Sequence, residues 1–261
     1  MKVFLRSVYN FIRLMGFDIR MFLMFWRHFP KYLGQYLKVL RWSNDWPVSR
    51  LFPIFSDMYE GAGTASGHYF HQDLYFAQKI FKKGPGTHCD IGSRIDGFVA
   101  HILAFRSIVV IDIRKMESKV KGLLFKQADL MNLSEEFYNT YESVSCLHAL
   151  EHFGLGRYTD PLNPDGYRLG FANLSKMLKN DGILYFSVPV GRQRIEFNAH
   201  RIFSIDTILS LAHDNGLELI DFDFVDDNGD FVSVNSIEET KLKRISEKLV
   251  YGCGMFTFRK I

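Results

Sequence analysis

Three aspartates follow three successive apolar runs of the sequence, and their spacing is typical of a nucleoside pocket. Asp90 lies near the end of the first run, Asp112 ends the second run 22 residues later, and Asp129 follows the third. Because the carboxyl ends of parallel strands meet at one edge of a sheet, we expect these side chains to lie close together. An acid about 20 residues after the first strand accepts hydrogen bonds from ribose hydroxyls. Asp129 is then placed to accept one from an adenine amino group.

The turn after the first apolar run indicates which nucleoside is bound. Gly92 lets the backbone approach a ligand closely, where a Cβ would clash. A dinucleotide pyrophosphate favours the pattern G-x-G-x-x-G, but Arg94 stands at the second glycine position. S-adenosyl-L-methionine carries no phosphate, and its amino group suits Asp90 while its ribose suits Asp112. We therefore predict this cofactor rather than a nicotinamide. The neighbouring contacts predicted for it are Ser93, Ile113 and Leu130.

Two stretches rich in titratable groups, residues 147–153 and 196–201, follow the fourth and fifth apolar runs, at the same expected edge. A sugar hydroxyl is a poor nucleophile at neutral pH, and a base that removes its proton accelerates its attack by about 10²–10⁴-fold. Histidine suits this role because its unperturbed pKa is about 6.5. We predict His152 as the base, with Glu151 orienting it or contacting the substrate, and His200 as the alternative base.

The loop after the fifth run also carries basic and amide side chains. These are Arg192, Arg194, Asn198 and Arg201. Arginine suits bidentate capture of phosphate or carboxylate, so they are the predicted contacts of an anionic substrate group. The alternative is that they are solvated loop charges.

No metal site is expected from the sequence. The aspartates that come closest to a metal motif lie in runs typical of turns, and they are Asp160, Asp165, Asp226 and Asp227. The three cysteines, Cys89, Cys146 and Cys253, are far apart and odd in number. This argues against a disulfide scaffold or a zinc site and favours a reducing, cytoplasmic compartment.

The elements that would position these residues alternate between strand and helix from residue 87 onward. Strands are predicted at residues 87–91, 107–113, 123–128, 141–147, 183–188, 217–225 and 255–259. Helices are predicted at 68–82, 98–105, 167–178, 204–213 and 237–248, with a turn at 179–182. This alternation argues for an α/β fold with a mostly parallel, doubly wound, Rossmann-like sheet of seven strands.

Residues 1–41 differ from the rest of the chain. Apolar and basic residues alternate there with a helical period, and Pro30 and Pro47 are expected to break the segment. Residues 1–46 carry a net charge of +6, whereas the whole chain carries +3. A basic, aromatic helix suits peripheral contact with an anionic membrane surface, at the inner face of the membrane. The alternative is a helical cap packed on the main domain or on a second subunit of a homo-oligomer.

Composition excludes several classes of protein. Hydrophobic residues make up 47% of the 261 residues and charged residues 23%, so a core can form. The chain lacks the basic stripe of a nucleic-acid binder. No uncharged apolar run approaches the roughly 18 residues of a membrane span, and Arg6 and Arg13 interrupt any signal-peptide core.

Several long blocks also resemble a known family. DIGSRIDGFVAHILAF, LHALEHFGLGRYTDPLNPDGY, GILYFSVPVGRQRIEFNAHRIFS and VDDNG, within about residues 67–230, resemble a domain-of-unknown-function family first named from nematode sequences. This family lies within the class I S-adenosylmethionine (SAM)-dependent methyltransferases. The resemblance implies cofactor contacts at Asp90, Gly92, Asp112 and Asp129, with Leu147 and His148 flanking the methionine end. It also implies that His68, Tyr69, His71 and Gln72 form a lid over the cofactor.

The resemblance implies a division into an N-terminal helical extension, residues 1–66, and a methyltransferase domain, residues 67–261. Bacterial members commonly occur among surface-polysaccharide genes, which implies O-methylation of a sugar in a glycan or a nucleotide-sugar precursor. Two alternatives stay open. Arg94 and the basic arm favour a catalytically degenerate binding module at the membrane face, and the 25 phenylalanines favour a lipid or quinone substrate.

Overall fold

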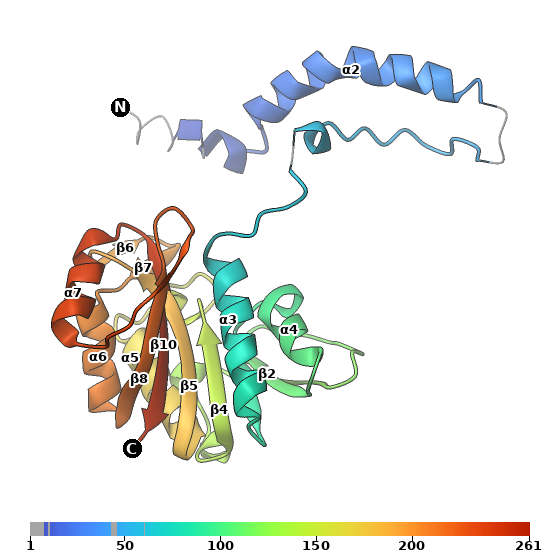
Figure 1. Cartoon of the computed structure of the whole chain (residues 1–261). Coiled ribbons are helices and arrows are strands. Elements are labelled where there is room, and N and C mark those ends of the chain that lie inside the picture. Colours follow the sequence, from blue (N-terminus) through green and yellow to red (C-terminus); the bar gives the residue numbers. More distant parts are fainter. Residues whose placement is uncertain (1–7, 10, 43–45, 60) are drawn as a thin grey trace. The chain divides into compact units, whose positions relative to one another are not determined.

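The computed structural model describes residues 8–9, 11–42, 46–59 and 61–261. The chain divides into two compact units, residues 1–64 and residues 65–261. Figure 1 shows the second unit as a twisted sheet flanked by helices. All the predicted site residues belong to this second unit.

The second unit is built on an eight-stranded sheet with the order β3-β2-β1-β4-β5-β10-β8-β9. The strands are β1 (His88–Ile91), β2 (Ile108–Asp112), β3 (Leu123–Gln127), β4 (Tyr141–Leu147), β5 (Leu178–Val190), β8 (Leu217–Val225), β9 (Phe231–Ser233) and β10 (Gly252–Lys260). Neighbouring strands from β3 to β5 pair in parallel, whereas β10 is antiparallel to both β5 and β8. The predicted α/β class and the doubly wound, mostly parallel sheet are confirmed. The short antiparallel edge strand β9 is an addition that the sequence did not predict.

Helices cover both faces of this sheet, which is why its central strands read as nearly continuous apolar runs. The helices are α3 (His68–Lys83), α4 (Ala100–Leu103), α5 (Gly166–Met177), α6 (Ile205–Asp214) and α7 (Glu239–Lys248). Side chains of α3 and α4, such as Phe76 and Ile102, pack with one face of the strands. Side chains of α5, α6 and α7, such as Phe171 and Ile208, pack with the other face.

Short helical turns and a hairpin lie between these elements. They are η2 (Ile95–Val99), η3 (Leu130–Asn132), η4 (Glu135–Phe137), η5 (Leu150–His152) and the hairpin β6 (Arg194–Glu196) and β7 (His200–Ile202). Ser204 caps α6, as predicted, because its hydroxyl accepts from the Thr207 N–H at 3.2 Å.

The strand order reverses between β1 and β4. The chain passes from β1 outward to β2 and β3, and then returns to pair β4 with the other side of β1. The loops after β1 and β4 therefore diverge at the carboxyl ends of these strands, and a crevice opens between them. Gly92 lies in this crevice with φ of 70°, and a Cβ at that position would come 3.1 Å from the Ala149 Cβ.

The largest difference from the predicted elements is at the start of β5. The turn predicted at residues 179–182 is a bulge inside this strand, because Tyr141 pairs with Leu178 and Ser143 already pairs with Ile183. Asp181 adopts φ of 60° in the bulge, a conformation that aspartate tolerates better than most residues.

The first unit contains α2 (Ile19–Val39), with Asp18 as its N-cap. The helix runs through Pro30, so the break predicted there is wrong. A proline inside a helix removes one hydrogen bond, which neighbouring turns can tolerate. His28 bonds to the Tyr59 hydroxyl at 2.8 Å, and the ring of Phe25 packs on Phe55.

The arm exposes a large apolar surface. Phe22, Leu23 and Trp26 of α2 are all exposed, and the residues of the predicted arm before Val8 lie outside the described part. Among the described residues, no helix is long and apolar enough to cross a membrane. Membrane contact by this arm stays a prediction.

Candidate functional site

A cleft opens at the carboxyl ends of β1, β2, β3 and β4. It is lined by Ile91, Gly92, Ile111, Asp112, Ile113, Arg114, Ala128, Asp129, Leu130, Met131, His148, Ala149, His152, Phe153, Tyr158 and Asp160. The same cleft is thus lined by His148, by His152 and by five of the predicted cofactor residues, which are Gly92, Asp112, Ile113, Asp129 and Leu130. Their convergence follows from the strand order, because four neighbouring parallel strands end at this edge.

Asp112 is already engaged by a residue of its own chain. The Arg114 guanidinium donates to both Asp112 oxygens, at 2.9 and 2.6 Å, and the Arg114 backbone N–H donates at 2.8 Å. The guanidinium also lies over the ring of Tyr158, 4.6 Å from its centre. Any ligand that uses the Asp112 carboxylate must therefore share it with Arg114 or displace Arg114.

Arg94 lies outside the cleft, although its position in the turn after β1 suggested that it would lie beside the cofactor. It pairs with Asp96 at 2.7 Å, the two side chains are 66% and 73% exposed, and neither lines the cleft. The arginine that enters the cleft is Arg114. The sequence could have predicted that Arg114 lies near Asp112, because the two are two residues apart and such residues in an extended chain project to the same side.

Asp90 lies beneath the cleft rather than in its wall. Its carboxyl is fully buried, and accepts from the Ser93 N–H at 3.0 Å, from the Ser93 hydroxyl at 2.8 Å and from the Ser145 hydroxyl at 2.6 Å. Burial raises the pKa of Asp90 to about 7, and the hydrogen bonds from Ser145 and Ser93 oppose this rise. These contacts brace the turn that carries Gly92. A direct contact between Asp90 or Ser93 and a cofactor stays a prediction.

Asp129 and Leu147 are also placed by local structure. Asp129 caps η3 by accepting from the Met131 N–H at 2.8 Å, and it lines the cleft. Leu147 ends β4 and is buried in the core, outside the cleft lining. Tyr69 follows the first residue of α3, and its ring centre lies 5.4 Å from that of His148. Gln72 is buried and accepts from the Ser187 hydroxyl at 2.6 Å, so this part of the predicted lid is fixed against the sheet.

A buried histidine–carboxylate pair stands at the end of β4. His148 Nδ1 lies 2.8 Å from Glu151 Oε1, and the two side chains are only 3% and 2% exposed. Burial alone would raise the pKa of Glu151, but the adjacent imidazole of His148 holds it below its ordinary value. The backbone of His148 has φ of 51°, a left-handed conformation that costs a non-glycine residue about 1 kcal/mol. Such strained residues cluster at functional sites.

His152 Nδ1 has two polar neighbours. It lies 2.7 Å from the carbonyl oxygen of Ala199, which can only accept, and 3.2 Å from the Arg157 guanidinium, which can only donate. Burial lowers the pKa of His152, against the opposing charge of Glu151, so the ring is neutral at neutral pH. Glu151 Oε1 lies 3.7 Å from His152 Nε2.

Three buried polar atoms around this pair have no hydrogen-bond partner in the described structure: His148 Nε2, Glu151 Oε2 and His200 Nε2. Leaving a buried polar group unpaired costs about 1–3 kcal/mol, and a ligand or ordered water at this place would satisfy all three atoms. Aromatic rings surround them. Tyr251 lies between His68 and His200, with ring centres 5.0 and 5.2 Å away. Burial lowers the pKa of His68 to about 4 and also lowers the pKa of His200.

The predicted substrate residues do not gather in the main cleft. Arg194 and Arg201 line a second hollow of about 580 Å³, beside Tyr167. Arg194 donates to Glu196 and to the carbonyl of Val250, and Arg201 donates to the carbonyl of Phe153. Arg192 and Asn198 are exposed. Capture of an anionic group by these side chains stays a prediction.

Asp160 and Asp226, two of the predicted turn-forming aspartates, hold turns, whereas the Asp227 carboxylate accepts from the distant backbone N–H groups of Val250 and Tyr251. The buried Asp160 carboxylate accepts from the backbone N–H groups of Gly154, Gly156 and Tyr158. Asp226 accepts in the same way from Asn228 and Asp230. Arg114, Tyr158 and Asp160 are cleft residues that the sequence reasoning missed.

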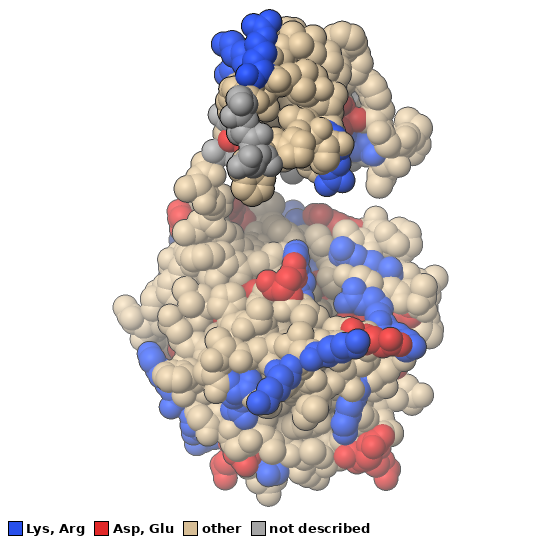
Figure 2. Space-filling view, turned by 90° about the vertical axis from the view of Figure 1, so that its right-hand side faces the viewer, with Lys and Arg blue, Asp and Glu red and all other residues tan. Residues whose placement is uncertain are grey.

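The face shown in Figure 2 carries basic side chains next to acidic ones rather than an unbroken basic field. Elsewhere in the chain, ion pairs join near neighbours in sequence, including Arg114 with Asp112 and Lys115 with Glu117.

The strand order and the crevice at the β1–β4 switch point define a class I SAM-dependent methyltransferase fold, and solved structures share it. A candidate sarcosine dimethylglycine methyltransferase from Galdieria sulphuraria is 16% identical over 73% of this chain and 85% of its own, with a TM-score of 0.52. A candidate methyltransferase from Bacillus halodurans is 14% identical over 72% of this chain and 98% of its own, with a TM-score of 0.51.

The [4+2]-cyclase SpnF is also similar, at 14% identity over 71% of this chain and 80% of its own, with a TM-score of 0.51. A cyclase among these neighbours shows that the fold alone does not determine the reaction. The chain belongs to the family described as "Caenorhabditis protein of unknown function, DUF268", whose model matches residues 99–250. The resemblance seen in the sequence is thus confirmed. A search of curated proteins found no match.

Proposed function

We propose that this protein is a SAM-dependent methyltransferase that methylates a sugar hydroxyl of a surface glycan or of its nucleotide-sugar precursor. One observation carries the proposal. The cleft at the switch point is lined both by acids suited to a nucleoside, Asp112 and Asp129, and by a histidine, His152.

The cleft fits the cofactor in chemistry. Asp112 would accept from the ribose hydroxyls and Asp129 from the adenine amino group. Ile113, Leu130 and Met131 supply apolar walls for the base. Gly92 leaves open a space that a Cβ would fill. When bound, SAM supplies a methyl group on a positively charged sulfur.

The residues beside the cleft perform the acid–base work. His152 Nε2 removes the proton of the acceptor hydroxyl, which makes the oxygen a better nucleophile toward the methyl carbon. This step requires the tautomer in which Nδ1 carries the hydrogen, which the carbonyl of Ala199 favours and the Arg157 guanidinium opposes. The Glu151 carboxylate, 3.7 Å from Nε2, stabilises the imidazolium that results.

A sugar is favoured as the acceptor because the unpartnered atoms are suited to hydroxyls. Glu151 Oε2 can accept from a hydroxyl, and His200 Nε2 can donate to one or accept from one.

Cofactor binding is tested by isothermal titration of the full chain with S-adenosylhomocysteine. Asp112→Asn removes the charge that attracts the ribose hydroxyls, and a charged hydrogen bond contributes about 1.5–3 kcal/mol. The dissociation constant should rise about tenfold or more. Asp96→Asn is the matched control, because Asp96 is exposed outside the cleft. Equal binding by the wild type and Asp112→Asn would refute the cofactor site.

Methyl transfer is tested with labelled SAM and a panel of nucleotide sugars and extracted surface polysaccharide. His152→Gln should reduce transfer by about 10²–10⁴-fold, while its affinity for S-adenosylhomocysteine stays near that of the wild type. Labelling of lipid rather than sugar would move the substrate class to lipids. Full transfer by His152→Gln would exclude His152 as the base and leave His200 as the candidate.

A further inference from the structure

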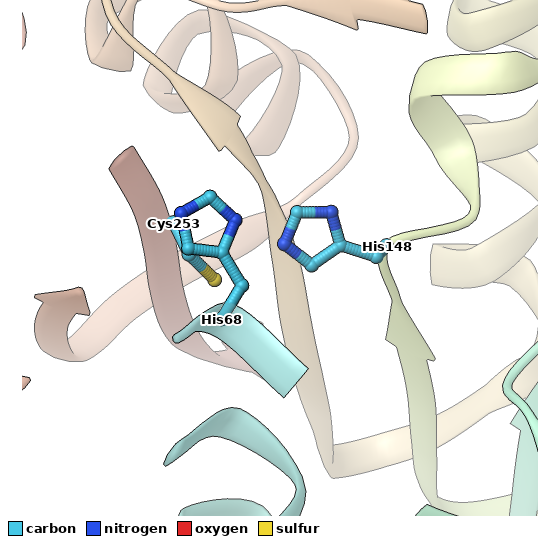
Figure 3. Close-up of side chains that lie close together, drawn as sticks. All are labelled: His68, His148 and Cys253. Carbon is cyan, nitrogen blue, oxygen red and sulfur yellow. The ribbon is translucent and has the colours of Figure 1, made fainter. Parts of the chain in front are cut away.

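Three side chains from distant parts of the sequence converge beside the cleft. They are His68 at the start of α3, His148 after β4 and Cys253 on β10, as Figure 3 shows. One ligand atom of each lies within 4.8 Å of those of the other two. We propose that His68, His148 and Cys253 bind a zinc ion. The proposal does not depend on methyl transfer.

The strongest evidence is the state of His148. Its side chain is 3% exposed, and its Nε2 has no hydrogen-bond partner in the described structure. The other ring nitrogen, Nδ1, is paired with the Glu151 carboxylate at 2.8 Å. Metal-binding histidines show this arrangement, because the carboxylate takes the N–H and leaves the second nitrogen free for the ion. A metal at Nε2 would satisfy an atom that is otherwise buried without a partner.

Cys253 adds a soft ligand to the cluster. It is fully buried on β10, and its sulfur lies 3.7 Å from the Gln72 carbonyl oxygen and next to the imidazole of His148. A buried thiol has no need of a polar neighbour, but here it lies in a group with two imidazoles. A bound metal converts such a thiol to the thiolate. The ring of His68 lies 5.2 Å from that of His148, at an angle of 18°.

The donor set selects the ion. Two imidazole nitrogens and one thiolate suit zinc, whereas magnesium and calcium prefer oxygen. Ligand atoms around one tetrahedral zinc lie roughly 3.3–3.8 Å apart, as bonds of about 2.0–2.3 Å require. The three atoms must therefore approach by about 1 Å, which small rotations of the side chains provide. Three protein ligands leave the fourth position open to water or to a substrate atom, as in catalytic zinc sites.

The test uses the full chain freed of metal by a chelator. Titration with zinc against a chromophoric chelator should show one site per chain. Titration with Co²⁺ should show the near-ultraviolet charge-transfer band of a cobalt–thiolate bond. Cys253→Ala should lose that band and weaken zinc binding by about a hundredfold or more. Cys146→Ala is the matched control, since Cys146 is also fully buried but lies outside the cluster.

Glu151→Gln separates the role of the carboxylate from that of the ligands. It keeps all three ligands but replaces the carboxylate behind His148, and such changes weaken metal affinity about 10–100-fold. Wild-type protein without the thiolate band would overturn the proposal, whether or not Cys253→Ala folds. Unchanged zinc affinity in Cys253→Ala would also overturn it.

Discussion

Replacement of Arg114 by alanine should tighten the binding of S-adenosylhomocysteine. The Arg114 guanidinium donates to both oxygens of Asp112, at 2.9 and 2.6 Å. Two neighbouring ribose hydroxyls would approach the same carboxylate edge, because a bidentate guanidinium occupies both of its in-plane acceptor positions. Binding of the cofactor therefore competes with this internal ion pair.

The size of the effect follows from exposure. The Arg114 side chain is 54% exposed and that of Asp112 is 14% exposed, so solvent screening limits the pair to about 0.2–1 kcal/mol. The contact of the guanidinium with the ring of Tyr158 adds about 0.5 kcal/mol. Since 1.4 kcal/mol corresponds to a factor of ten, the dissociation constant of Arg114→Ala should fall by about three- to tenfold.

Isothermal titration of the full chain measures this change. Arg94→Ala is the control, because Arg94 also pairs with an aspartate two residues away but lies outside the cleft. Its affinity should stay near that of the wild type. Weaker binding by Arg114→Ala would refute the competition and show that the guanidinium holds the cofactor.

Two further predictions concern stability. Burial lowers the pKa of His88 to about 3 from 6.5, so the unfolded chain takes up a proton first as the pH falls. The stabilisation is complete above pH 6.5 and is lost toward pH 3, by about 1.4 kcal/mol per pH unit. Urea denaturation at several pH values measures the free energy of unfolding of the wild type and of His88→Gln. The difference between the two should show this slope, and a difference that does not change with pH would contradict the prediction. A Cβ on Gly154 would come 2.0 Å from the Asn163 oxygen, whereas one on Gly84, which has a similar positive φ, meets nothing within 4 Å. Gly154→Ala should therefore be about 1–3 kcal/mol less stable than Gly84→Ala, and equal unfolding midpoints would contradict the clash.

The parts of the fold that the sequence predicted well are those with strong local patterns. The predicted bounds of β4 and β8 match the structure, because each strand begins directly after polar or turn-forming residues, Asn139-Thr140 before β4 and Asn215-Gly216 before β8. Asp112, Asp129 and His152 were placed together by one general rule, that parallel strands end at a common edge. No detail of side-chain packing was needed for that step.

The features that were missed depend on contacts between distant or competing groups. The spacing of residues 68, 148 and 253 matches no metal motif, so only the folded chain brings these side chains within 4.8 Å of one another. The prediction of no zinc site rested on the spacing of the cysteines from one another. It did not include the histidines. The bulge at the start of β5 was read as a turn, because a glycine after an aspartate is typical of both.

Glu151 connects the two proposed sites. Its Oε1 lies 2.8 Å from His148 Nδ1, on the side of the proposed zinc site, and 3.7 Å from His152 Nε2, the proposed base. Removal of this charge in Glu151→Gln should therefore weaken zinc binding and slow methyl transfer together. Cys253 belongs to the proposed zinc cluster but makes no hydrogen bond to His152 in the described structure, so Cys253→Ala should weaken metal binding about a hundredfold or more without removing the base. If Cys253→Ala still transfers methyl groups, the zinc is structural. If it loses transfer, and raising the SAM concentration does not restore it, the ion acts on the acceptor.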